Sequence, residues 1–551
     1  MKILLAACNA KYIHSNPAVY DLKAFAGKYE DFIVLKEYTI NQTKDEILRS
    51  VYLEKPDLVC VSCYIWNITF VRNLVCDLAK ILPDTRFFAG GPEVSFDAED
   101  FLRENPQFTG VMVGEGEETF LELTAHYVEG KSELKDIRGL VYRDAAGIHN
   151  TGVREMTDLS SIPFVYGNLQ DFEHRIIYYE SSRGCPFSCS YCLSSVDKKL
   201  RFRSLELVKK ELQFFLDHQV SQVKFVDRTF NCRHKHAMEI WQYLAEHDNG
   251  ITNFHFEISA DLITEEELQL MAGMRPGLIQ LEIGVQSTNP ETIRAIRRTM
   301  DFEKLCETVA RIRSFGNIHQ HLDLIAGLPY EDYDSFRKSF LDVYGLRPQQ
   351  LQLGFLKVLK GSYMKEMASG YRLIYQEQEP YEVLSTAWLG YDEILRLKTV
   401  ESMVEVYYNS GQFQNTLEYL ETCFADAFTM YEALGAFYER HGYEQISHSR
   451  IRRYDILLEF VRERPDISEE RIVRGMMTDL YLRENLKSRP SFAPPQKAYE
   501  KEIREFRRRN SIPKTAHIEA VSEKRWLLFD YEHRDPLTNN AKMTEIRTDE
   551  V

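Results

Sequence analysis

Positive charge is scarce in this sequence of 551 residues. It contains 68 lysine and arginine residues against 84 aspartate and glutamate residues, which leaves a formal net charge of −16 at pH 7. Because a phosphate backbone repels such a chain, the composition argues against generic binding to nucleic acid. Long apolar runs are also missing, and no stretch reaches the length needed to cross a bilayer. We therefore expect no membrane-spanning segment.

Cysteine is neither dense nor regularly spaced. A secreted scaffold held by disulfides would not distribute its thiols in this way, which favours reduced thiols or metal ligands. The apolar start of the chain, residues 1–17, fits a buried first strand better than a signal peptide. We therefore expect a cytoplasmic protein. The ten cysteines are Cys8, Cys60, Cys63, Cys76, Cys185, Cys189, Cys192, Cys232, Cys306 and Cys423.

The first part of the chain, residues 1–135, alternates short apolar runs with amphipathic stretches. This pattern predicts a doubly wound, Rossmann-like parallel sheet in an α/β domain. Ligands of such sheets bind at the carboxyl ends of the strands, where glycine and polar residues gather in this sequence. The apolar runs are KILLAA, DFIVL, DLVCVSC, RFFAGG and GVMVG.

The rest of the chain predicts three further parts. Residues 136–175 indicate a hairpin followed by a linker, and residues 176–370 contain six strand and helix units, which favour an open or partial (β/α)6 barrel. Residues 371–551 are predicted to be mostly helical, with aromatic side chains in the core rather than around a cofactor. A hairpin is expected over residues 517–535.

One basic stretch, residues 497–514, departs from the acidic character of the chain. It contains seven basic and three acidic residues, with Arg507, Arg508 and Arg509 in succession. A solvated helix face is the preferred interpretation, and a patch for nucleic acid is the alternative.

Three thiols lie close together in RGCPFSCSYC, directly after the first predicted barrel strand. Thiolates are the usual ligands of iron–sulfur clusters, and a cluster iron without a protein ligand stays open to another molecule. Gly184 and Pro186 would help a short loop to fold around a bulky group. A zinc site and inert structural thiols are the alternatives, but zinc normally takes four ligands and no further pair follows at finger spacing.

The spacing of Cys185, Cys189 and Cys192 resembles the C-x3-C-x-aromatic-C signature of the radical S-adenosylmethionine (SAM) superfamily, with Tyr191 as the aromatic residue. The resemblance implies that the three cysteines bind a [4Fe–4S] cluster and that SAM chelates the fourth iron. It further implies reductive cleavage of SAM to a 5′-deoxyadenosyl radical, with an electron donor such as flavodoxin or ferredoxin.

Residues 176–364 resemble the core of the oxygen-independent coproporphyrinogen oxidase branch of that superfamily. The resemblance implies four further contacts to SAM. Carboxylates suit its ribose hydroxyls or ammonium group, and a guanidinium suits its carboxylate. Arg297 competes with Arg298 for the last role. The implied contacts are Glu257 in FEIS, Gln286 in IGVQS, Arg298 in IRRT and Asp323 in LDLIAGLP.

The pair GGPE and GEGEETF in the first domain resembles the cobalamin-binding domain that precedes the radical core in cobalamin-dependent members. Glu93 stands where the family usually has histidine, and the glycines are expected to let a large cofactor approach the backbone. The D-x-H-x-x-G signature for a lower cobalt ligand is absent, and His14 is interpreted as a polar loop residue rather than as that ligand. The implied cobalamin contacts are Gly90, Gly91, Pro92, Gly114 and Gly116.

The predicted function is that of a cobalamin-binding radical SAM enzyme that C-methylates or otherwise rearranges an unactivated carbon of a small molecule. One alternative is a methylthiotransferase-like enzyme that modifies tRNA, with an auxiliary cluster on cysteines such as Cys8, Cys60, Cys63 or Cys76 and with residues 497–514 as the contact. A second alternative is a non-catalytic cobalamin or redox sensor. No resemblance covers residues 375–551, where the substrate is expected to be recognised.

Overall fold

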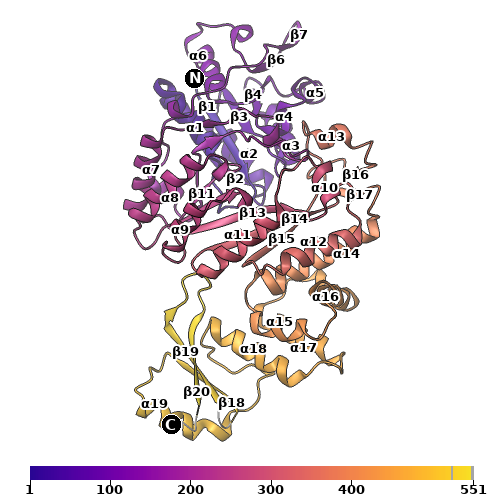
Figure 1. The fold of residues 1–551 in the computed structure, drawn as a ribbon. Helices are drawn as coiled ribbons and strands as arrows, with labels where there is room; N and C mark the ends of the chain where they lie inside the picture. Colours follow the sequence, from indigo (N-terminus) through magenta and orange to yellow (C-terminus); the bar gives the residue numbers. More distant parts are fainter. Residues whose placement is uncertain (523–524, 548–551) are drawn as a thin grey trace. The chain divides into compact units, whose positions relative to one another are not determined.

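The computed structural model describes residues 1–522 and 525–547, and Figure 1 shows its ribbon. The chain divides into two compact units. The first comprises Met1–Leu270, Ile293–Met300 and Phe355–Ala387, and the second comprises Met271–Thr292, Asp301–Gly354 and Trp388–Val551. Among the described residues, no helix combines the length and the apolar character that a membrane crossing requires.

A twisted sheet with strand order β2-β1-β3-β4-β5-β6-β7 forms the amino-terminal part of the first unit. Its first five strands are parallel, as the sequence predicts for a doubly wound sheet. β1 is buried along its whole length because helices cover both faces of the sheet. The parallel strands are β1 (Ile3–Asn9), β2 (Ile33–Thr39), β3 (Leu58–Ser62), β4 (Arg86–Gly90) and β5 (Gly110–Met112).

Alternate side chains of β1 enter two separate hydrophobic cores. Leu4, Ala6 and Cys8 pack on one face of the sheet, and Ile3 and Leu5 pack on the other. This two-sided burial explains why the strand reads as a continuous apolar run. The helices of this part are α1 (Pro17–Phe25), α2 (Lys44–Glu54), α3 (Ile68–Ile81), α4 (Pro92–Ser95), α5 (Ala98–Glu104) and α6 (Glu117–Glu129).

The hairpin that follows extends the same sheet. β6 (Leu140–Asp144) pairs antiparallel with β5, and β7 (Gly147–Asn150) pairs antiparallel with β6. Residues 151–176 then form a linker that contains two short 3-10 turns.

The first unit also contains three strands of the predicted barrel. β8 (Ile177–Tyr179), β11 (Gln222–Phe225) and β12 (Asn253–Ile258) are parallel, in the order β12-β11-β8. Their outer side chains meet a buried aromatic core around Trp241 and Phe225. The intervening helices are α7 (Leu205–Asp217) and α8 (His234–Glu246), and α9 (Glu265–Ala272) follows β12.

The second unit contains the three remaining predicted strands. β13 (Ile279–Gln286) pairs in parallel with β14 (His319–Ala326), and β15 (Gln350–Phe355) lies beside β14. Every second residue of β13 is buried, so Glu282, Gly284 and Gln286 share the opposite face. The six predicted strand and helix units are therefore all present. Three helices accompany these strands: α10 (Pro290–Ala295), α11 (Phe302–Phe315) and α12 (Tyr333–Tyr344).

The carboxyl-terminal part of the second unit is mostly helical, as predicted. Its core contains fully buried aromatic side chains, and the hydroxyls of Tyr407 and Tyr438 lie 2.8 Å apart. These aromatics belong to the core, as the sequence indicates. The helices are α14 (Tyr391–Met403), α15 (Gln414–Glu421), α16 (Ala427–His441), α17 (Arg450–Arg462) and α18 (Glu469–Arg483).

A three-stranded antiparallel sheet follows these helices in the sequence. β18 (His517–Ser522) and β19 (Arg525–Arg534) confirm the predicted hairpin, although residues 523–524 lie outside the described residues, as do residues 548–551 of the predicted last domain. β20 (Ala541–Arg547) pairs with β19 and is an addition to the prediction (Figure 1).

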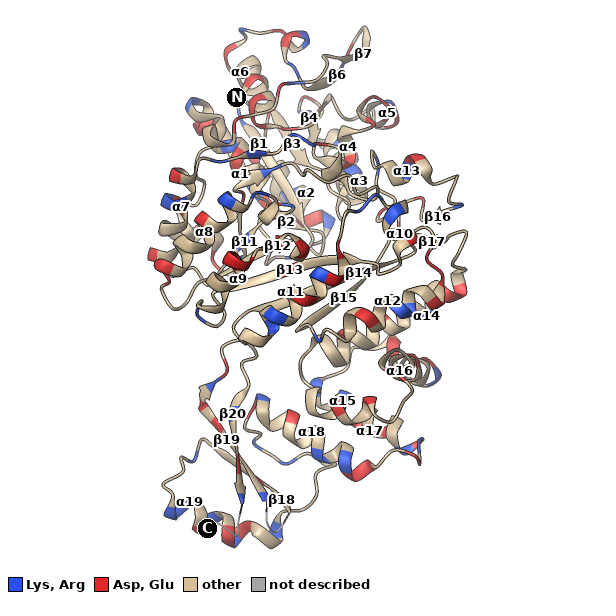
Figure 2. Cartoon of the chain, viewed as in Figure 1, with Lys and Arg blue, Asp and Glu red and all other residues tan. Residues whose placement is uncertain are grey.

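The basic stretch forms α19 (Glu500–Arg509), which has no buried residue. Both acidic and basic side chains occur on it (Figure 2), and Arg507 Nη2 donates to the backbone oxygen of Ala516 at 2.7 Å. This arrangement agrees with the interpretation of a solvated helix face.

Asp479 of α18 is expected to stabilise the second unit. Its carboxylate is 3% exposed and accepts hydrogen bonds of 2.7–2.9 Å from the backbone and side chains of Asn415 and Thr416 at the start of α15. Asp479→Ala should lower the free energy of unfolding by about 2–4 kcal/mol, because it leaves two buried and two half-buried donors without their acceptor.

Urea unfolding, monitored by hydrogen exchange at residues 414–421, measures this loss. Asp466→Ala is the control, since Asp466 is exposed and its only side-chain partner among the described residues is Arg464. Equal effects of the two substitutions would contradict the prediction.

Candidate functional site

The two ends of the cysteine loop, residues 184–200, lie side by side. β9 (Ser182–Arg183) precedes it and pairs antiparallel with β10 (Arg201–Phe202), which follows it. Gly184 has φ +95°, and a Cβ there would lie 2.7 Å from the backbone oxygen of Lys199, so only glycine fits this crossing. The backbone N–H of Cys185 donates to Asp197 O at 3.1 Å and closes the loop.

The three thiols lie inside this loop at different depths. Cys185 and Cys189 are each 8% exposed, Cys192 is half-buried, and burial raises the pKa of the Cys185 thiol. A single zinc ion binds sulfur at about 2.3 Å, so its sulfur ligands lie at most about 4.6 Å apart. Within the described residues, the three sulfurs do not form a group with all atoms within 4.8 Å of one another. At least two of the three sulfurs therefore lie farther apart than the ligands of one zinc ion.

The middle of the loop is held from two sides. The Ser190 N–H donates to Ile296 O at 2.8 Å, and the Met364 N–H donates to Ser190 O at 2.7 Å. Arg298 Nη1 lies 3.8 Å from Cys189 Sγ and 3.4 Å from the Tyr191 hydroxyl. A cation is thereby placed beside the sulfur.

Arg297, the competitor of Arg298, points elsewhere. Its guanidinium stacks over the ring of Tyr363 at 3.4 Å. Of the two arginines, therefore, Arg298 is the one beside the cysteine loop.

The other predicted SAM contacts lie on strands of both units. In the first unit, Glu257 is half-buried near the carboxyl end of β12. In the second, Gln286 ends β13 with φ +73°, and its side-chain Oε1 is buried without a hydrogen-bond partner among the described residues. Asp323 lies on β14, where His321 Nε2 is 3.0 Å from its Oδ1.

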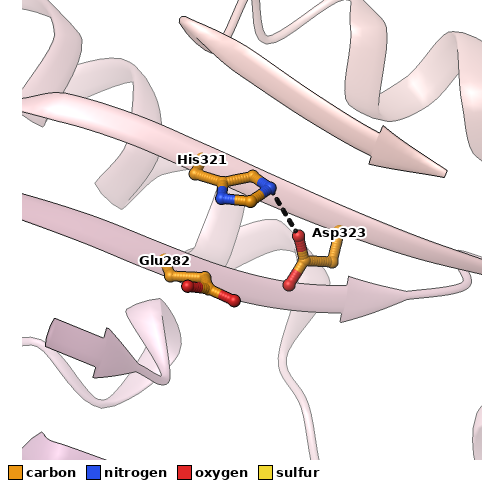
Figure 3. Close-up of side chains that lie close together, drawn as sticks. All are labelled: Glu282, His321 and Asp323. Atoms are coloured by element: carbon orange, nitrogen blue, oxygen red, sulfur yellow. Dashed lines mark ion pairs between the residues drawn. The ribbon is translucent and has the colours of Figure 1, made fainter. Parts of the chain in front are cut away.

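Glu282 lies beside His321 and Asp323, as Figure 3 shows, and one ligand atom from each residue lies within 4.8 Å of the others. Sequence reasoning missed Glu282 and His321. A signal was present, because each is an even number of residues from a predicted contact on its own strand and so shares its face. The cluster offers two carboxylates and an imidazole that can hold or pass a proton.

The turn after Gln286 rests on a buried acid. Glu331 is fully buried, and its Oε1 accepts hydrogen bonds from the hydroxyls of Ser287 at 2.6 Å and Ser339 at 2.9 Å. The Asn289 N–H in turn donates to Ser287 Oγ at 3.0 Å. Burial raises the pKa of Glu331 to about 7, although the two serine hydroxyls act to lower it. This residue, too, was missed.

A cavity of about 1220 Å³ lies in the first unit. It exceeds the volume of sites for drug-sized ligands, which is about 300–1000 Å³. Leu193, Val196 and Asp197 of the cysteine loop contribute to its wall, so this loop and the glycine turns open onto one cavity. The glycine-turn residues that line it include every predicted cobalamin contact: Gly90, Gly91, Pro92, Gly114 and Gly116.

The glycines of these turns have a steric function. Gly91 has φ +111°, and a Cβ there would lie 2.5 Å from the backbone oxygen of Cys63. Gly114 has φ +77°, and a Cβ there would meet nothing within 4 Å, so the backbone itself is open to a ligand. Glu93 is not part of the cavity wall; it is buried and accepts a hydrogen bond from the Tyr381 hydroxyl at 2.9 Å.

The amino-terminal cysteines are poor ligands as the structure places them. Cys8, Cys60 and Cys63 are buried, and burial raises the pKa of Cys8 to about 12 and that of the other two further. Cys76 is exposed. Within the described residues, these four form no group of three with ligand atoms within 4.8 Å of one another. His14 Nδ1 lies 2.6 Å from the Tyr178 hydroxyl, as expected for a polar loop residue.

Three family models match the chain in succession. Residues 4–124 match the B12 binding domain, residues 179–343 match the radical SAM superfamily, and residues 369–546 match a protein family of unknown function, DUF4080.

Curated relatives match a little over half of the chain. An uncharacterized methyltransferase, PH0819 from Pyrococcus horikoshii, is 27% identical over 323 residues, which cover 57% of this chain and 67% of that protein. The cobalamin-dependent radical SAM methyltransferase TokK from Streptomyces tokunonensis is 27% identical over 314 residues. That match covers 51% of this chain and 44% of TokK, so this chain spans less than half of the relative.

The solved structure of the cobalamin-dependent SAM radical enzyme OxsB with aqua-cobalamin and SAM bound is similar in fold. Its TM-score is 0.60 at 16% identity, and the match covers 93% of this chain and 81% of that chain. The predicted fold class is thereby confirmed: a doubly wound amino-terminal domain, a central partial (β/α)6 barrel and a mostly helical carboxyl-terminal part.

Glu331 is expected to make stability depend on pH. Its pKa is raised from 4.5 to about 7, so the protonated form stabilises the fold. This contribution is complete below pH 4.5 and is lost as the pH rises through about 7, and it amounts to at most about 3 kcal/mol. Glu331→Gln, which stays neutral, should flatten the pH dependence over this range.

Urea unfolding at pH 5, 6, 7 and 8 measures this change. Glu303→Gln, at an exposed position, is the matched control. An unchanged slope in Glu331→Gln would show that the buried carboxyl is already ionised at pH 5.

Proposed function

This chain belongs to the radical SAM proteins that carry an amino-terminal B12-binding domain, and from this premise we propose that it is a cobalamin-dependent methyltransferase that acts on an unactivated carbon. The observation that carries the proposal is the shared cavity, onto which the glycine turns and the cysteine loop both open. When bound, SAM and a [4Fe–4S] cluster supply a 5′-deoxyadenosyl radical that removes a hydrogen atom, and methylcobalamin supplies the methyl group.

The cysteine loop would hold the cluster. Cys185, Cys189 and Cys192 are its proposed ligands, and their spacing supports a group larger than one ion. Arg298 beside Cys189 would offset the negative charge of the thiolates, and the half-buried ring of Tyr191 would help to exclude water.

Further residues would bind and orient SAM. In the first unit, Glu257 offers a carboxylate for hydroxyl or ammonium groups, and Arg298 offers a guanidinium for a carboxylate. In the second unit, Gln286 offers a buried amide oxygen that has no hydrogen-bond partner among the described residues, and Asp323 offers a carboxylate 3.0 Å from His321 Nε2.

The glycine turns would hold the corrin. A cavity of about 1220 Å³ with Gly90, Gly91, Pro92, Gly114 and Gly116 in its wall supports this assignment. Such backbone turns at the carboxyl ends of parallel strands are the usual ligand sites of doubly wound sheets.

The alternatives have less support. A methylthiotransferase-like enzyme needs an auxiliary cluster, whereas the buried thiols of Cys8, Cys60 and Cys63 favour the neutral form. A sensor without catalysis would not need a complete set of side chains for SAM. We propose a small-molecule substrate and an external electron donor such as flavodoxin or ferredoxin as partners, in preference to tRNA.

The proposed function is tested on anaerobically reconstituted protein. We expect one corrin per chain in the visible spectrum and 5′-deoxyadenosine after addition of SAM and reductant. Cys189→Ala should abolish this product, whereas Cys76→Ala, at an exposed thiol outside the site, should retain it. Extracts of cells with the wild-type protein should contain a metabolite heavier by one methylene than those with Cys189→Ala.

Each result that contradicts the proposed function favours one of the two alternative functions. A second cluster without corrin would favour the methylthiotransferase-like enzyme. Bound corrin with no 5′-deoxyadenosine would favour the sensor.

Gly91→Ala is expected to weaken corrin binding. The new Cβ would meet the Cys63 backbone at 2.5 Å in a left-handed conformation, so the turn must shift. We expect roughly tenfold weaker binding in an absorbance titration with aquacobalamin, because such strain costs about 1–3 kcal/mol.

Gly130→Ala is the matched control, since Gly130 also has a positive φ of +67° but lies in open space outside the cavity. Equal corrin affinity in the two variants would contradict the placement of the corrin at the Gly91 turn.

A further inference from the structure

The acidic residues of the GEGE turn contact the base of the cysteine loop. Arg183 and Arg201 are directly opposite each other on β9 and β10, at the two ends of the loop. Both guanidinium groups reach Glu115: Arg201 donates to both carboxylate oxygens, one bond measuring 3.0 Å, and Arg183 Nη1 lies 3.5 Å away. One carboxylate thus joins the two ends of the loop.

The linker passes through the same contact. The Thr157 N–H donates to Glu115 Oε2 at 2.9 Å, and Thr157 O accepts from Arg201 Nη1 at 2.8 Å. Glu115 therefore binds the amino-terminal domain, the linker and the cysteine loop together.

The two arginines also bind further acidic side chains. Arg183 Nη2 donates to Glu117 Oε1 at 2.8 Å and to Glu180 Oε2 at 2.7 Å, and Arg201 Nη2 donates to Asp197 Oδ2 at 3.1 Å. Of these three acids, Glu117 belongs to the GEGE turn and Asp197 belongs to the cysteine loop.

These ion pairs differ from ordinary surface pairs. The side chains of Glu115, Arg183 and Arg201 are 19%, 21% and 13% exposed, and the pair between Glu115 and Arg201 is bidentate. Burial acts to raise the pKa of Glu115, but the two arginines outweigh it and the pKa is lowered. Without Glu115, two cations on directly opposed strand positions would repel each other.

The same turn forms part of the cavity wall. Gly114, Glu115, Gly116 and Glu117 line the cavity, and so does Arg183. A ligand that settles on the glycines therefore touches the backbone that carries the two carboxylates.

We propose that Glu115 couples occupancy of this cavity by a corrin to the order of the cysteine loop. The inference rests on the proposed function for the identity of the ligand, but the contacts themselves concern only this chain. Coupling of this kind is reciprocal, so an occupied cysteine loop must strengthen corrin binding by the same factor. Glu115 is thus a positioning residue for the cluster site.

Hydrogen exchange of cluster-free protein, with and without aquacobalamin, tests the proposal. In the wild-type protein, aquacobalamin should slow exchange over residues 184–200. Without corrin, exchange over these residues should be roughly fivefold or more faster in Glu115→Gln than in the wild type, a factor typical of coupled sites. With corrin, exchange in Glu115→Gln should not slow. Glu133→Gln, an exposed position with the same change of charge, should behave as the wild type.

Corrin affinity gives the reciprocal measurement. Reconstitution of the cluster should strengthen aquacobalamin binding in the wild-type protein and in Glu133→Gln, but not in Glu115→Gln. An absorbance titration with and without the cluster measures this difference.

The two failures are distinguishable. No corrin bound to the wild-type protein overturns the proposed function. If corrin binds but hydrogen exchange of the loop is the same in Glu115→Gln as in the wild type, the coupling is overturned.

Exchange over α3, distant in sequence from the loop, reports whether Glu115→Gln retains its fold. If it does not, Arg201→Lys decides, because it keeps the charge and loses the bidentate geometry. Wild-type coupling in Arg201→Lys would overturn the proposal, and lost coupling would support it.

Discussion

The ionic contact of Glu115 with Arg183 and Arg201 is the constraint on which the cysteine loop depends. The loop carries little buried apolar surface besides two of its cysteines, so packing alone cannot hold its ends. Its shape follows from a crossing that only Gly184 permits and from charges that need a shared counter-ion. Because the counter-ion belongs to the GEGE turn, the loop is formed correctly only on a folded amino-terminal domain.

Parallel strands explain why the candidate sites lie where they do. The carboxyl ends of β3, β4 and β5 point their turns into the cavity, and β8 leads into the cysteine loop on another part of its wall. A parallel sheet gathers such ends along one edge, so residues far apart in sequence share one wall.

Local signals made much of this predictable. The buried strands are continuous apolar runs in the sequence. The spacing of the three thiols and of the glycines can also be recognised in the sequence without knowledge of the fold. The ion pairs do not, because Glu115 and Arg201 are 86 residues apart and each resembles any solvated charge. Glu331 and Ser287, 44 residues apart, were hidden for the same reason, whereas Glu282 and His321 were readable from strand periodicity.

Glu93 shows how a departure from a family pattern can have a structural cause. Glu93, which stands where the family resemblance leads us to expect histidine, accepts a hydrogen bond from the Tyr381 hydroxyl, and burial raises the pKa of its carboxyl. Lys360 pairs with Asp97 at 2.9 Å, and a Cβ on Gly361 would meet the ring of Phe96. Lys360, Gly361 and Tyr381 therefore pack against the GGPE turn and the residues that directly follow it. Because Tyr381 lies in the region that matches DUF4080, the glutamate and that region are expected to occur together.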